Sequence, residues 1–574
     1  MDAKAHVAQL LRDALRAVAP EVQIEPALER PRDAAHGDYA CTAALQLARS
    51  LGRKPREIAE AVVAAMRALP GWRDGVLSDC AVAGPGFINL RLSPAAKQAV
   101  VRRALADGPD YGRGTPLVAQ RILVEFVSAN PTGPLHVGHG RCAAYGASLA
   151  NLLAFAGHRV EREFYVNDAG RQVDILALCV WLRYLEEHGR PTQFPEDGYR
   201  GAYVQELARE LAAAHGPRFL REPPPPGSGT TPEAALDAQI SAARDRLGGD
   251  WDAVVEFARE RLLADQRDDL AAFGVTFDRW VSERSLQASG AVERTVAALT
   301  ARGHAYEKDG ALWFRASAFG DEKDRVLRRD NGQYTYFAAD IAYHADKFAR
   351  GYDRLIDVWG ADHHGYVARV RGALAALGLP VERLEIALYQ FAVLWRDGEK
   401  LAMGKRSGEF VTLRELRSEV GRDAARFFYV LRKADQHLDF DLDLARSESL
   451  DNPVYYVQYA HARVASLFAQ WGGDARRLVH ADLSGLVAPR ELALMQRCAE
   501  FPDAVAEAAA ELAPHRIAFY LRELAADFHG YYNAERILVP DDRLRQARLA
   551  LCAAVRQTIA NGLALLGVSA PERM

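Results

Sequence analysis

Residues 121–145 read RILVEFVSANPTGPLHVGHGRCAAY, and this stretch decides the fold that we expect. It opens with an apolar run over 122–127, rich in β-branched and aromatic side chains, which predicts a buried strand. A turn over 130–134 follows, and an alanine-rich helical pattern covers 141–155. The first amides of a helix have no partner within the helix, so a strand, a tight turn and a helix start together predict an anion-binding site.

Two histidines, His136 and His139, stand at the start of this expected helix. Their i, i+3 spacing turns both rings the same way, so both can donate to phosphate oxygens. Gly138 between them leaves room for a flat ring to approach the backbone. An isolated pair with this spacing is more often a metal site or simply solvated, but the preceding strand and turn favour a phosphate site.

Composition is that of an ordinary globular protein: of 574 residues, 49% are apolar and 26% are charged. This length predicts about three or four domains. The net charge is -4, so any nucleic-acid contact must come from local basic patches. Six cysteines without a Cys-x-x-Cys pair argue against a structural zinc site and a disulfide framework. With no N-terminal signal pattern and no apolar run that could span a bilayer, we expect a cytoplasmic protein without a membrane contact.

Three regions differ in pattern along the chain. Residues 1–115 predict a small α+β module that ends in a turn-rich linker. Residues 116–450 predict a doubly wound parallel, Rossmann-like sheet, because a second strand at 160–166 completes a βαβ unit. A mostly helical insertion is expected between the two halves of that sheet, at about 171–320. From 451 to 574 the pattern is helical throughout, which predicts an all-α bundle.

The N-terminal module contains a strand pattern over 87–92 in which Phe87, Asn89 and Arg91 share one face. An aromatic ring, an amide and a guanidinium side by side suit one unstacked base and its phosphate. The simpler interpretation is an amphipathic edge strand with a solvated face, and spacing alone favours that interpretation.

The second half of the expected sheet carries polar residues near its strand ends. Tyr336 and Asp340 lie four residues apart, on one face if their segment is helical, although an aspartate at a helix start is also a common cap. A strand pattern at 355–359 is followed by an Asp-His-His string that ends at His364. This string has no obvious further metal ligand, so we favour polar contact to a ribose or an amino acid over a metal site.

A basic, glycine-bearing loop, DGEKLAMGKRSG, covers 397–408. It nearly matches a phosphate-binding Walker A loop, but its glycine spacing is one residue too long, and Arg406 stands where serine or threonine should follow the lysine. The loop also comes too late in the expected sheet for that role.

In the helical C-terminal region, Tyr455 and Tyr459 share one helix face, with Tyr456 beside them. Such a stripe is usually core, but interleaved polar residues also suit base stacking, and spacing does not separate the two interpretations. Tyr459 is the better candidate for a nucleic-acid contact.

The stretch around His136 resembles the His-Ile-Gly-His signature of class I aminoacyl-tRNA synthetases, and residues 125–136 are similar to the arginyl-tRNA synthetase version. The Gly-Pro-Gly-Phe-Ile-Asn string at 84–89 resembles the N-terminal domain of that family, which touches the tRNA D-loop. The helical tail is similar to the anticodon-binding domain of the same family. In recognisable strings, the resemblance covers about residues 80–574.

The loop at 397–408 resembles the Lys-Met-Ser-Lys loop of class I synthetases, which closes over the ATP phosphates. Three positions match, and these are Met403, Lys405 and Arg406. Two positions differ, because Ala402 replaces the first lysine and Gly404 replaces the serine. Lys400, two residues earlier, is a candidate to replace the first lysine.

The resemblance implies an arginine–tRNA ligase, which uses ATP to convert L-arginine to arginyl-adenylate and then transfers the arginyl group to the terminal ribose of tRNA(Arg), releasing AMP and pyrophosphate. It implies ATP as a substrate with Mg²⁺, a monomeric chain, and tRNA(Arg), L-arginine and ATP as partners. Two rivals stay open: a nucleotidylyltransferase with the same histidine turn, and a noncatalytic tRNA-binding relative.

The resemblance also assigns the residues of the site. The catalytic group comprises His136, His139 and Lys405, and the ATP contacts add Gly138, Met403 and Arg406. The arginine contacts are Glu125, Ser128, Asn130, Tyr336, Asp340 and His364, with Glu125 and Asp340 facing the guanidinium. The tRNA contacts are Phe87, Asn89, Tyr459 and Met574. We expect no protein-bound metal.

Overall fold

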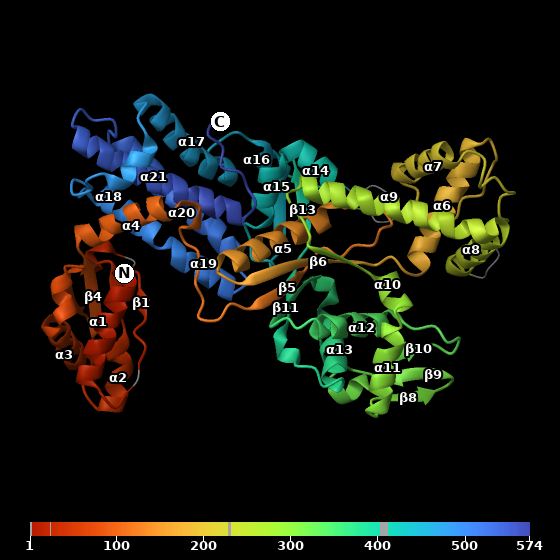
Figure 1. Cartoon of the computed structure of the whole chain (residues 1–574), viewed down its shortest axis with the longest axis horizontal. Helices are drawn as coiled ribbons and strands as arrows, with labels where there is room; N and C mark the ends of the chain where they lie inside the picture. Colours follow the sequence, from red (N-terminus) through yellow and green to blue (C-terminus); the bar gives the residue numbers. More distant parts are fainter. Residues whose placement is uncertain (1–2, 23, 32, 228–230, 402–410) are drawn as a thin grey trace.

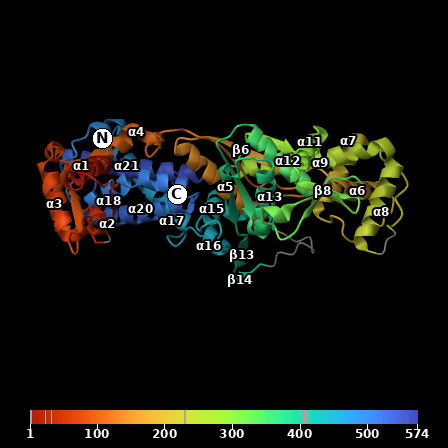
Figure 2. The same ribbon diagram turned by 90° about the horizontal axis from the view of Figure 1, so that it is seen from below.

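The computed structural model describes residues 3–22, 24–31, 33–227, 231–401 and 411–574 of the chain. The molecule is elongated, with the N-terminal module at one end, a helical lobe at the other and a parallel sheet between them (Figure 1, Figure 2). The C-terminal helices lie beside the sheet, next to the N-terminal module (Figure 1). Within the described ranges, no helix is long and apolar enough to cross a lipid bilayer.

Five parallel strands form the central sheet, in the order β12-β11-β5-β6-β7. Their bounds are β5 Arg121–Glu125, β6 Arg159–Val166, β7 Arg279–Ser282, β11 Arg354–Gly360 and β12 Leu384–Tyr389. Helix α5, Val137–Phe155, joins β5 to β6, and α13, His364–Ala376, joins β11 to β12. The chain winds outward from β5 in both directions, so the doubly wound fold expected from the sequence is confirmed, and its strand order reverses between β5 and β11.

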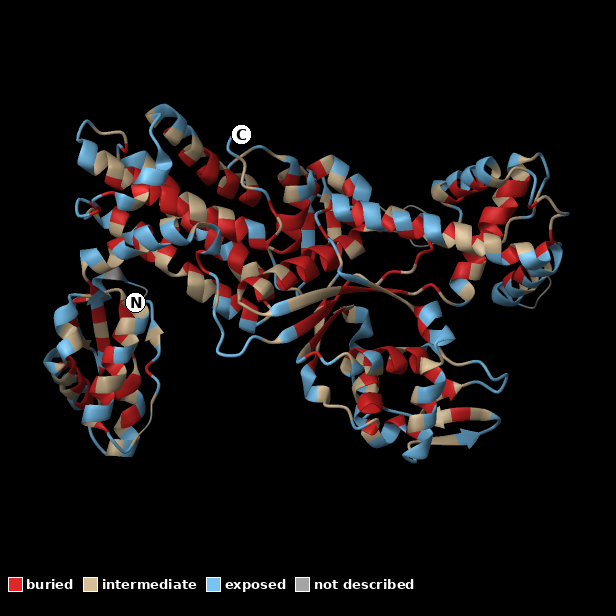
Figure 3. Ribbon diagram, viewed as in Figure 1, coloured by how far each residue is buried: buried red, intermediate tan, exposed pale blue. Residues whose placement is uncertain are grey.

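Strand β5 is a nearly continuous apolar run because helices cover both faces of the sheet: Ile122, Leu123 and Val124 are completely buried. Helix α5 crosses it closely, since a Cβ on Gly146 would lie 2.3 Å from the ring of Phe126. The apolar core formed here continues without a break into the C-terminal helices (Figure 3).

The segment between β6 and β7 forms the helical lobe, with a core of its own around Trp181, Leu207 and Val254. Its helices are α6 Arg171–Glu187, α7 Ala202–His215, α8 Pro232–Leu247 and α9 Trp251–Ala272. The chain then returns to the central sheet at β7. The insertion expected at about 171–320 therefore contains a strand of the central sheet, and the helical lobe itself ends with α9.

A second, smaller lobe follows β7. Its elements are α10 Glu283–Ala288, α11 Ala291–Ala301, the antiparallel strands β8 Ala305–Lys308, β9 Ala311–Phe314 and β10 Arg325–Arg328, and α12 Tyr336–Ala349. Thr335 caps α12 by accepting the amide of Ala338, so Asp340 lies inside the helix and is not its cap. Tyr336 and Asp340 therefore share one helix face, one turn apart.

After β12 the chain forms a small sheet in the order β14-β13-β15, with β13 Ala392–Arg396, β14 Glu399–Lys400 and β15 Leu438–Asp441. Three short helices surround it: α14 Leu413–Val420, α15 Arg422–Tyr429 and α16 Leu442–Arg446. The remaining chain is the all-helical bundle that the sequence predicts. Its helices are α17 Pro453–Trp471, α18 Pro489–Ala499, α19 Phe501–Ala510, α20 His515–Ala534 and α21 Asp542–Leu565.

The N-terminal module is an antiparallel sheet in the order β1-β2-β4-β3, covered by helices. Its elements are α1 Ala3–Val18, β1 Leu28–Glu29, β2 Tyr39–Cys41, α2 Ala43–Leu51, α3 Pro55–Ala68, β3 Leu77–Ala83 and β4 Phe87–Leu92. The buried core of the module ends at Leu92. The next helix, α4 Pro94–Asp107, packs against α18 and α21 of the C-terminal bundle (Figure 1).

Helix α12 turns a polar stripe toward the central sheet. Lys347 is completely buried and donates to Glu125 of β5 and to Asp357 of β11, the latter at 2.7 Å. His344 contacts the other carboxylate oxygen of Asp357 at 2.9 Å. Burial alone would raise the pKa of Asp357, but Lys347 and His344 lower it to about 2. One ammonium thus ties two adjacent strands to the helix that covers them.

The same stripe reaches a third strand. Glu163 of β6 accepts from the hydroxyl of Tyr343 at 2.7 Å and from Arg350 at 2.9 Å. Glu163 is completely buried, so these donors supply the hydrogen bonds that its carboxylate loses on leaving water. Helix α12 is therefore attached to β5, β6 and β11 by charged hydrogen bonds beneath the carboxyl edge of the sheet.

Replacing Lys347 by methionine should lower the free energy of unfolding by about 3–5 kcal/mol, because two buried carboxylates lose their shared counter-charge. Urea titration measures this loss as a lower unfolding midpoint. Lys433→Met is the matched control: its 2.8 Å pair with Asp435 leaves the two side chains 57% and 51% exposed. Removing such an exposed pair should cost at most ~1 kcal/mol. Equal losses in the two variants would contradict the role assigned to Lys347.

Candidate active site

The two histidines stand where the sequence places them, at the N-terminus of α5. His136 is the N-cap, and its Nδ1 accepts the amide of Gly138 at 3.1 Å. The Nδ1 of His139 accepts the amide of His136 at 3.2 Å, and the two rings stack with centroids 3.7 Å apart. Because each Nδ1 accepts a hydrogen bond, the proton of each neutral ring sits on Nε2, which makes Nε2 a donor. Two parallel donors at a helix N-terminus suit a phosphate group.

The basic loop falls partly outside the described residues: Met403, Lys405 and Arg406, together with Ala402 and Gly404, are not described. The chain on both sides of it is described. Lys400 ends β14 as an exposed residue. After the loop, the carbonyl of Val411 accepts the amide of Val137 at 3.1 Å, and the amide of Leu413 donates to Leu135 at 2.8 Å. The segment that follows the loop is therefore hydrogen-bonded directly to the histidine turn.

The backbone bends sharply where β5 ends. Val127 and Ser128 adopt φ values of 70° and 44°, in the left-handed region that non-glycine residues seldom enter. This bend lets the Ser128 hydroxyl donate to Glu125 at 2.7 Å and accept the Tyr165 amide at 3.1 Å. Asn130 follows, half-exposed, with its side-chain amide donating to Gln172. The structure thus brings Glu125, Ser128 and Asn130 together at one strand end.

A cluster of acidic side chains, called the acidic pocket below, surrounds Tyr165 beside this strand end, between β6, β7 and α12. The hydroxyl of Tyr165 is buried without a hydrogen-bond partner among the described residues. Burial raises its pKa, and so do the surrounding carboxylates, which are Glu283, Asp340, Glu125 and Asp168. Asp168 is already paired, with Arg259 at 2.8 Å, and Glu125 is paired with Lys347. The remaining two acids, Asp340 and Glu283, form no ion pair among the described residues: Asp340 accepts from the hydroxyl of Tyr366, and Glu283 accepts from Gln287 at 3.1 Å.

Burial dominates the electrostatics of these two acids. It raises the pKa of Asp340, which accepts the hydroxyl of Tyr366. It also raises the pKa of Glu283 to about 7, with the charges of Asp340 and Asp168 adding to the effect. The half-buried Asp340 and the buried Glu283, beside an unpartnered hydroxyl, form a site suited to a cation with several donors. A guanidinium group is such a cation.

The structure groups most of the predicted arginine contacts and adds one. Tyr336 lies on the same helix face as Asp340, exposed, and its hydroxyl is 3.1 Å from where a Cβ on Gly170 would lie. Glu283 was missed from the sequence because it follows β7, a short strand hidden in the expected insertion. His364 is exposed at the start of α13 and is not hydrogen-bonded to any described residue of the pocket. Among the described residues, no group of three or more His, Cys, Asp or Glu side chains suits a metal ion.

The candidate nucleic-acid contacts lie far from this pocket, on two other surfaces. On β4, burial alternates as expected, with Phe87 exposed, Asn89 half-exposed and Arg91 exposed. Two of the three therefore point out of the module, and none of them forms its core.

On the C-terminal bundle, aromatic rings form a ladder. Tyr455 stacks on Tyr459 with centroids 6.0 Å apart, and Tyr459 stacks on His529 at 5.7 Å. Arg463 lies over the rings of Tyr459 and Tyr532, at 5.0 Å and 4.4 Å. Half-exposed rings with a guanidinium beside them match the stacking surfaces that bind unpaired bases. Met574 is exposed at the end of the same bundle.

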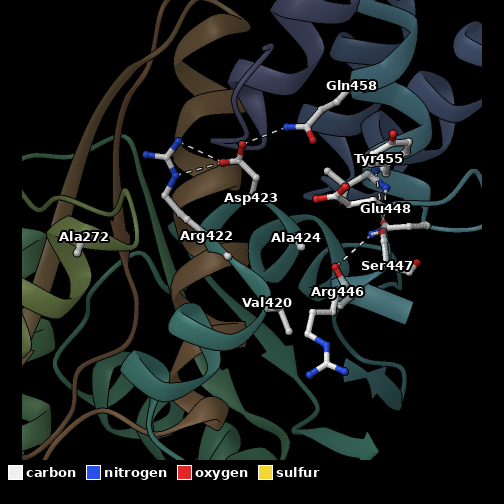
Figure 4. A pocket seen from close by; sticks show the side chains of 14 residues that line it. Ala272, Val420, Arg422, Asp423, Ala424, Arg446, Ser447, Glu448, Tyr455 and Gln458 are labelled. Atoms are coloured by element: carbon white, nitrogen blue, oxygen red, sulfur yellow. Dashed lines mark hydrogen bonds and ion pairs between the residues drawn. The ribbon is translucent and has the colours of Figure 1, made fainter. Parts of the chain in front are cut away.

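A pocket of about 560 Å³ lies at the joint between α15, α16 and α17 (Figure 4). Its polar side chains pair with one another: Arg422 contacts Asp423 at 3.1 Å, and Asp423 accepts from Gln458 at 3.0 Å. Of the candidate catalytic residues that the structure describes, none lines this pocket. We therefore assign it to the joint between the central region and the helical bundle.

Comparison with known proteins identifies the family. The arginyl-tRNA synthetase N-terminal domain matches residues 5–92, and the DALR anticodon-binding domain matches 457–574. The catalytic domain of class I (R) tRNA synthetases matches 101–206 and 252–438, which leaves out the middle of the helical lobe.

Relatives match over the full length. The arginine–tRNA ligase of Nitrosospira multiformis is 56% identical over 580 residues, covering 100% of this chain and 99% of its own. That of an Azoarcus species is 57% identical over 590 residues, covering 100% of both chains. The structure of Thermus thermophilus arginyl-tRNA synthetase superposes with a TM-score of 0.75 at 27% identity, over 100% of both chains. Since these matches span the whole chain and include the histidine turn, the chain belongs to the arginyl-tRNA synthetase family of class I aminoacyl-tRNA synthetases.

Proposed function

We propose that the protein is an arginine–tRNA ligase, which activates L-arginine with ATP and esterifies it to the terminal ribose of tRNA(Arg). One observation carries the choice of amino acid: the acidic pocket with Asp340 and Glu283 lies beside a phosphate-binding histidine turn. If the cationic side chain of an amino acid occupies that pocket, its carboxylate can reach the phosphates bound at the histidine turn. The rival noncatalytic role gives no reason for two adjacent acids to lack an ion pair.

In the first step, an oxygen of the arginine carboxylate attacks the α-phosphorus of ATP, and the bond to pyrophosphate breaks. This in-line transfer needs positioning and charge stabilisation more than covalent help from the protein. His136 and His139 supply donors from Nε2 to the phosphate oxygens as charge develops. In the second step, a hydroxyl of the terminal ribose attacks the adenylate carbonyl, and AMP leaves.

Lys405 is proposed to neutralise the departing pyrophosphate, with Met403 and Arg406 beside it on the loop. The support is the pairing of Val411 and Leu413 with the histidine turn, which holds the following segment at the phosphate site. Mg²⁺ is proposed to enter as MgATP, with ligands from the phosphate oxygens and water.

We assign the two ends of arginine to different acids. Lys347 already compensates Glu125, so Glu125, with Ser128 and Asn130, is proposed to contact the amino and carboxylate end rather than the guanidinium. Asp340 and Glu283 are proposed to bind the guanidinium, with the hydroxyls of Tyr336 and Tyr165 completing its hydrogen bonds. His364, at the carboxyl end of β11, is proposed as a polar contact at the amino-acid end.

The tRNA contacts are proposed on two parts of the chain. The module within residues 1–115 uses Phe87 and Asn89 on the D-loop, and the bundle at 451–574 uses Tyr459 and Met574 on the anticodon. The region at 116–450 carries the chemistry. One chain supplies every part, so we propose a monomer, acting in the cytoplasm where tRNA is charged for translation.

Pyrophosphate exchange tests the function directly. Exchange should appear with arginine alone among the amino acids, and only when tRNA(Arg) is present, as the family resemblance implies. Lysine is the sharpest comparison, because its ammonium is a single point charge that cannot satisfy two carboxylates with a planar fork. Exchange with lysine as fast as with arginine, or exchange without tRNA, would contradict this assignment.

Asp340→Ala should raise the arginine KM at least ~100-fold, because losing a charged hydrogen bond to the guanidinium should cost ~3 kcal/mol. Asp346→Ala is the matched control on the same helix: its carboxylate pairs with Arg350 at 3.1 Å and is 46% exposed. That change should leave the arginine KM within about twofold of wild type. An unchanged arginine KM in Asp340→Ala would contradict the assignment of Asp340 to the guanidinium.

The raised pKa of Glu283, about 7, makes arginine binding depend on pH. Below pH 7 this carboxyl holds its proton, and above pH 7 it is ionised and attracts the guanidinium. The arginine KM should therefore fall, by up to about tenfold, between pH 6 and pH 8.

Glu283→Gln should flatten that profile, whereas Glu293→Gln, on an exposed position of α11, should keep it. A wild-type profile that persists in Glu283→Gln would assign the titration to another group.

A further inference from the structure

One buried side chain of helix α9 contacts the turn between β5 and α5. Gln266 is 1% exposed, and its Nε2 donates to the carbonyls of Asn130 and Gly133, both at 2.9 Å. Pro131 and Pro134 have no amide to donate, so the backbone of this turn offers few hydrogen bonds of its own. None of the roles proposed above uses Gln266.

The contact requires a side-chain amide at this position. Both acceptors are carbonyl oxygens, so Gln266 presents its nitrogen to them, and the two N–H groups match the two oxygens. The Oε1 of the same amide is buried without a hydrogen-bond partner among the described residues. Burying such an atom costs free energy, which offsets part of what the two donated bonds contribute to stability. What Gln266 supplies is therefore chiefly the position of the turn.

Two further side chains of the helical lobe contact the same turn. The hydroxyl of Tyr203, on α7, donates to the carbonyl of Thr132 at 3.0 Å. The Oε1 of Gln172, on α6, accepts the side-chain amide of Asn130. Three helices of the lobe, α6, α7 and α9, therefore hold one turn of the candidate active site.

Helix α9, which runs from the lobe to the central region, also contacts the chain that follows the basic loop (Figure 1). Asp265 pairs with Arg414 at 2.6 Å, and the buried Asp269 pairs with Arg417 at 3.1 Å. Both arginines belong to α14, whose first residue donates its amide to the carbonyl just before the histidine turn. One helix thus contacts both segments that meet at the phosphate site.

The turn joins the two halves of the proposed reaction. Before it, Ser128 and Asn130 are proposed to contact the amino and carboxylate end of arginine. After it, His136 and His139 are proposed to donate to the phosphates. The shape of the turn therefore sets the distance between the attacking carboxylate and the α-phosphorus. Such atoms must approach within about 3–3.5 Å, and a displacement of ~1 Å can cost ~100-fold in rate.

We propose that Gln266 is a positioning residue for adenylate formation, which holds the turn so that the arginine carboxylate meets the α-phosphate in line. This inference rests on the proposed function and deepens it, because it gives the helical lobe a role in the first chemical step. In this role Gln266 acts through the turn and contacts neither substrate. Its loss should change how the two substrates lie relative to each other and leave the binding of each one nearly unchanged.

Gln266→Met keeps an unbranched side chain of similar length and removes both N–H donors. With tRNA(Arg) present, this change should lower the kcat of arginine-dependent exchange about 30-fold or more. The KM values of arginine and ATP should stay within about threefold of wild type, because the lost interaction matters mainly in the transition state.

Calorimetric titration supplies a second measurement that does not depend on turnover. The ligand is arginyl-sulfamoyl-adenosine, a stable molecule that joins an arginyl group to adenosine in one fixed relation. Gln266→Met should bind this joined ligand about 30-fold more weakly than wild type does, because its two ends no longer fit their contacts at the same time. The affinities for arginine alone and for adenosine alone should change less than about threefold.

Gln239→Met is the matched control. Gln239 is 3% exposed on α8, and its Nε2 donates at 2.9 Å to a carbonyl within the lobe, that of Gln193. A loss of stability, seen as a lower urea midpoint, should appear in both variants, because each leaves a buried carbonyl without its donor. The losses of kcat and of affinity for the joined ligand should appear in Gln266→Met alone.

A kcat and an affinity for the joined ligand that stay within about twofold of wild type in Gln266→Met overturn the proposal. Equal losses in Gln239→Met also overturn it, because the effect would then follow from the stability of the lobe. If Gln266→Met does not fold, Gln266→Asn, which withdraws the same amide by one methylene group, carries the same test. A wild-type protein without arginine-dependent exchange overturns the proposed function and this role with it, whereas an active wild type with an unaffected Gln266→Met overturns this role alone.

Discussion

A single buried ammonium, that of Lys347, decides which acids of the pocket remain available to a ligand. Parallel strands β5 and β11 place Glu125 and Asp357 side by side in the interior, where two carboxylates without a cation would repel each other strongly. Lys347 contacts both, so their charges are compensated by the protein itself. The attraction for a cationic substrate is then left to Asp340 and Glu283, which have no such partner among the described residues.

The same arrangement couples the pocket to the sheet. Lys347 and Asp340 belong to one stripe of α12, so the helix that carries the acid proposed to bind the guanidinium is also the helix attached to β5, β6 and β11. A site that must hold a planar guanidinium needs its acceptors fixed within a fraction of an ångström. Charged hydrogen bonds beneath the helix supply that rigidity where apolar packing alone would allow sliding.

Local pattern was sufficient for the parts of the site that are contiguous in sequence. The run from Arg121 to Phe155 forms the strand, turn and helix start that its residues predict, and the alternation over Phe87–Leu92 appears as burial. Glu283 could not be found in this way. Its strand, β7, is four residues long and pairs with β6 across a helical lobe, so it has no periodicity of its own to detect.

The ends and the packing of helices likewise depend partly on local sequence and partly on tertiary contacts. The sequence left open whether Asp340 caps α12 or lies within it, because aspartate and threonine are both acceptable caps. The packing of β10 against the helix start selects Thr335, whose hydroxyl also donates to Val326. Likewise α4 is predictable as a helix, but its packing on α18 and α21 depends on contacts with residues several hundred positions later. Helix propensity predicts where a helix forms, whereas tertiary contacts decide which domain it packs against.

Backbone strain at the end of β5 shows what the site requires. Val127 is β-branched and still adopts a φ of 70°, a conformation that costs on the order of 1–3 kcal/mol. Its amide is held by the Sγ of Cys142 at 3.2 Å, and the next residue, Ser128, gains two hydrogen bonds that an extended strand would not allow. Glycine would adopt this bend without strain, but it would also let the chain leave it. The contact of the Val127 amide with Cys142 and the two hydrogen bonds of Ser128 offset the strain of the valine, so these contacts hold the bend that places the Ser128 hydroxyl against Glu125.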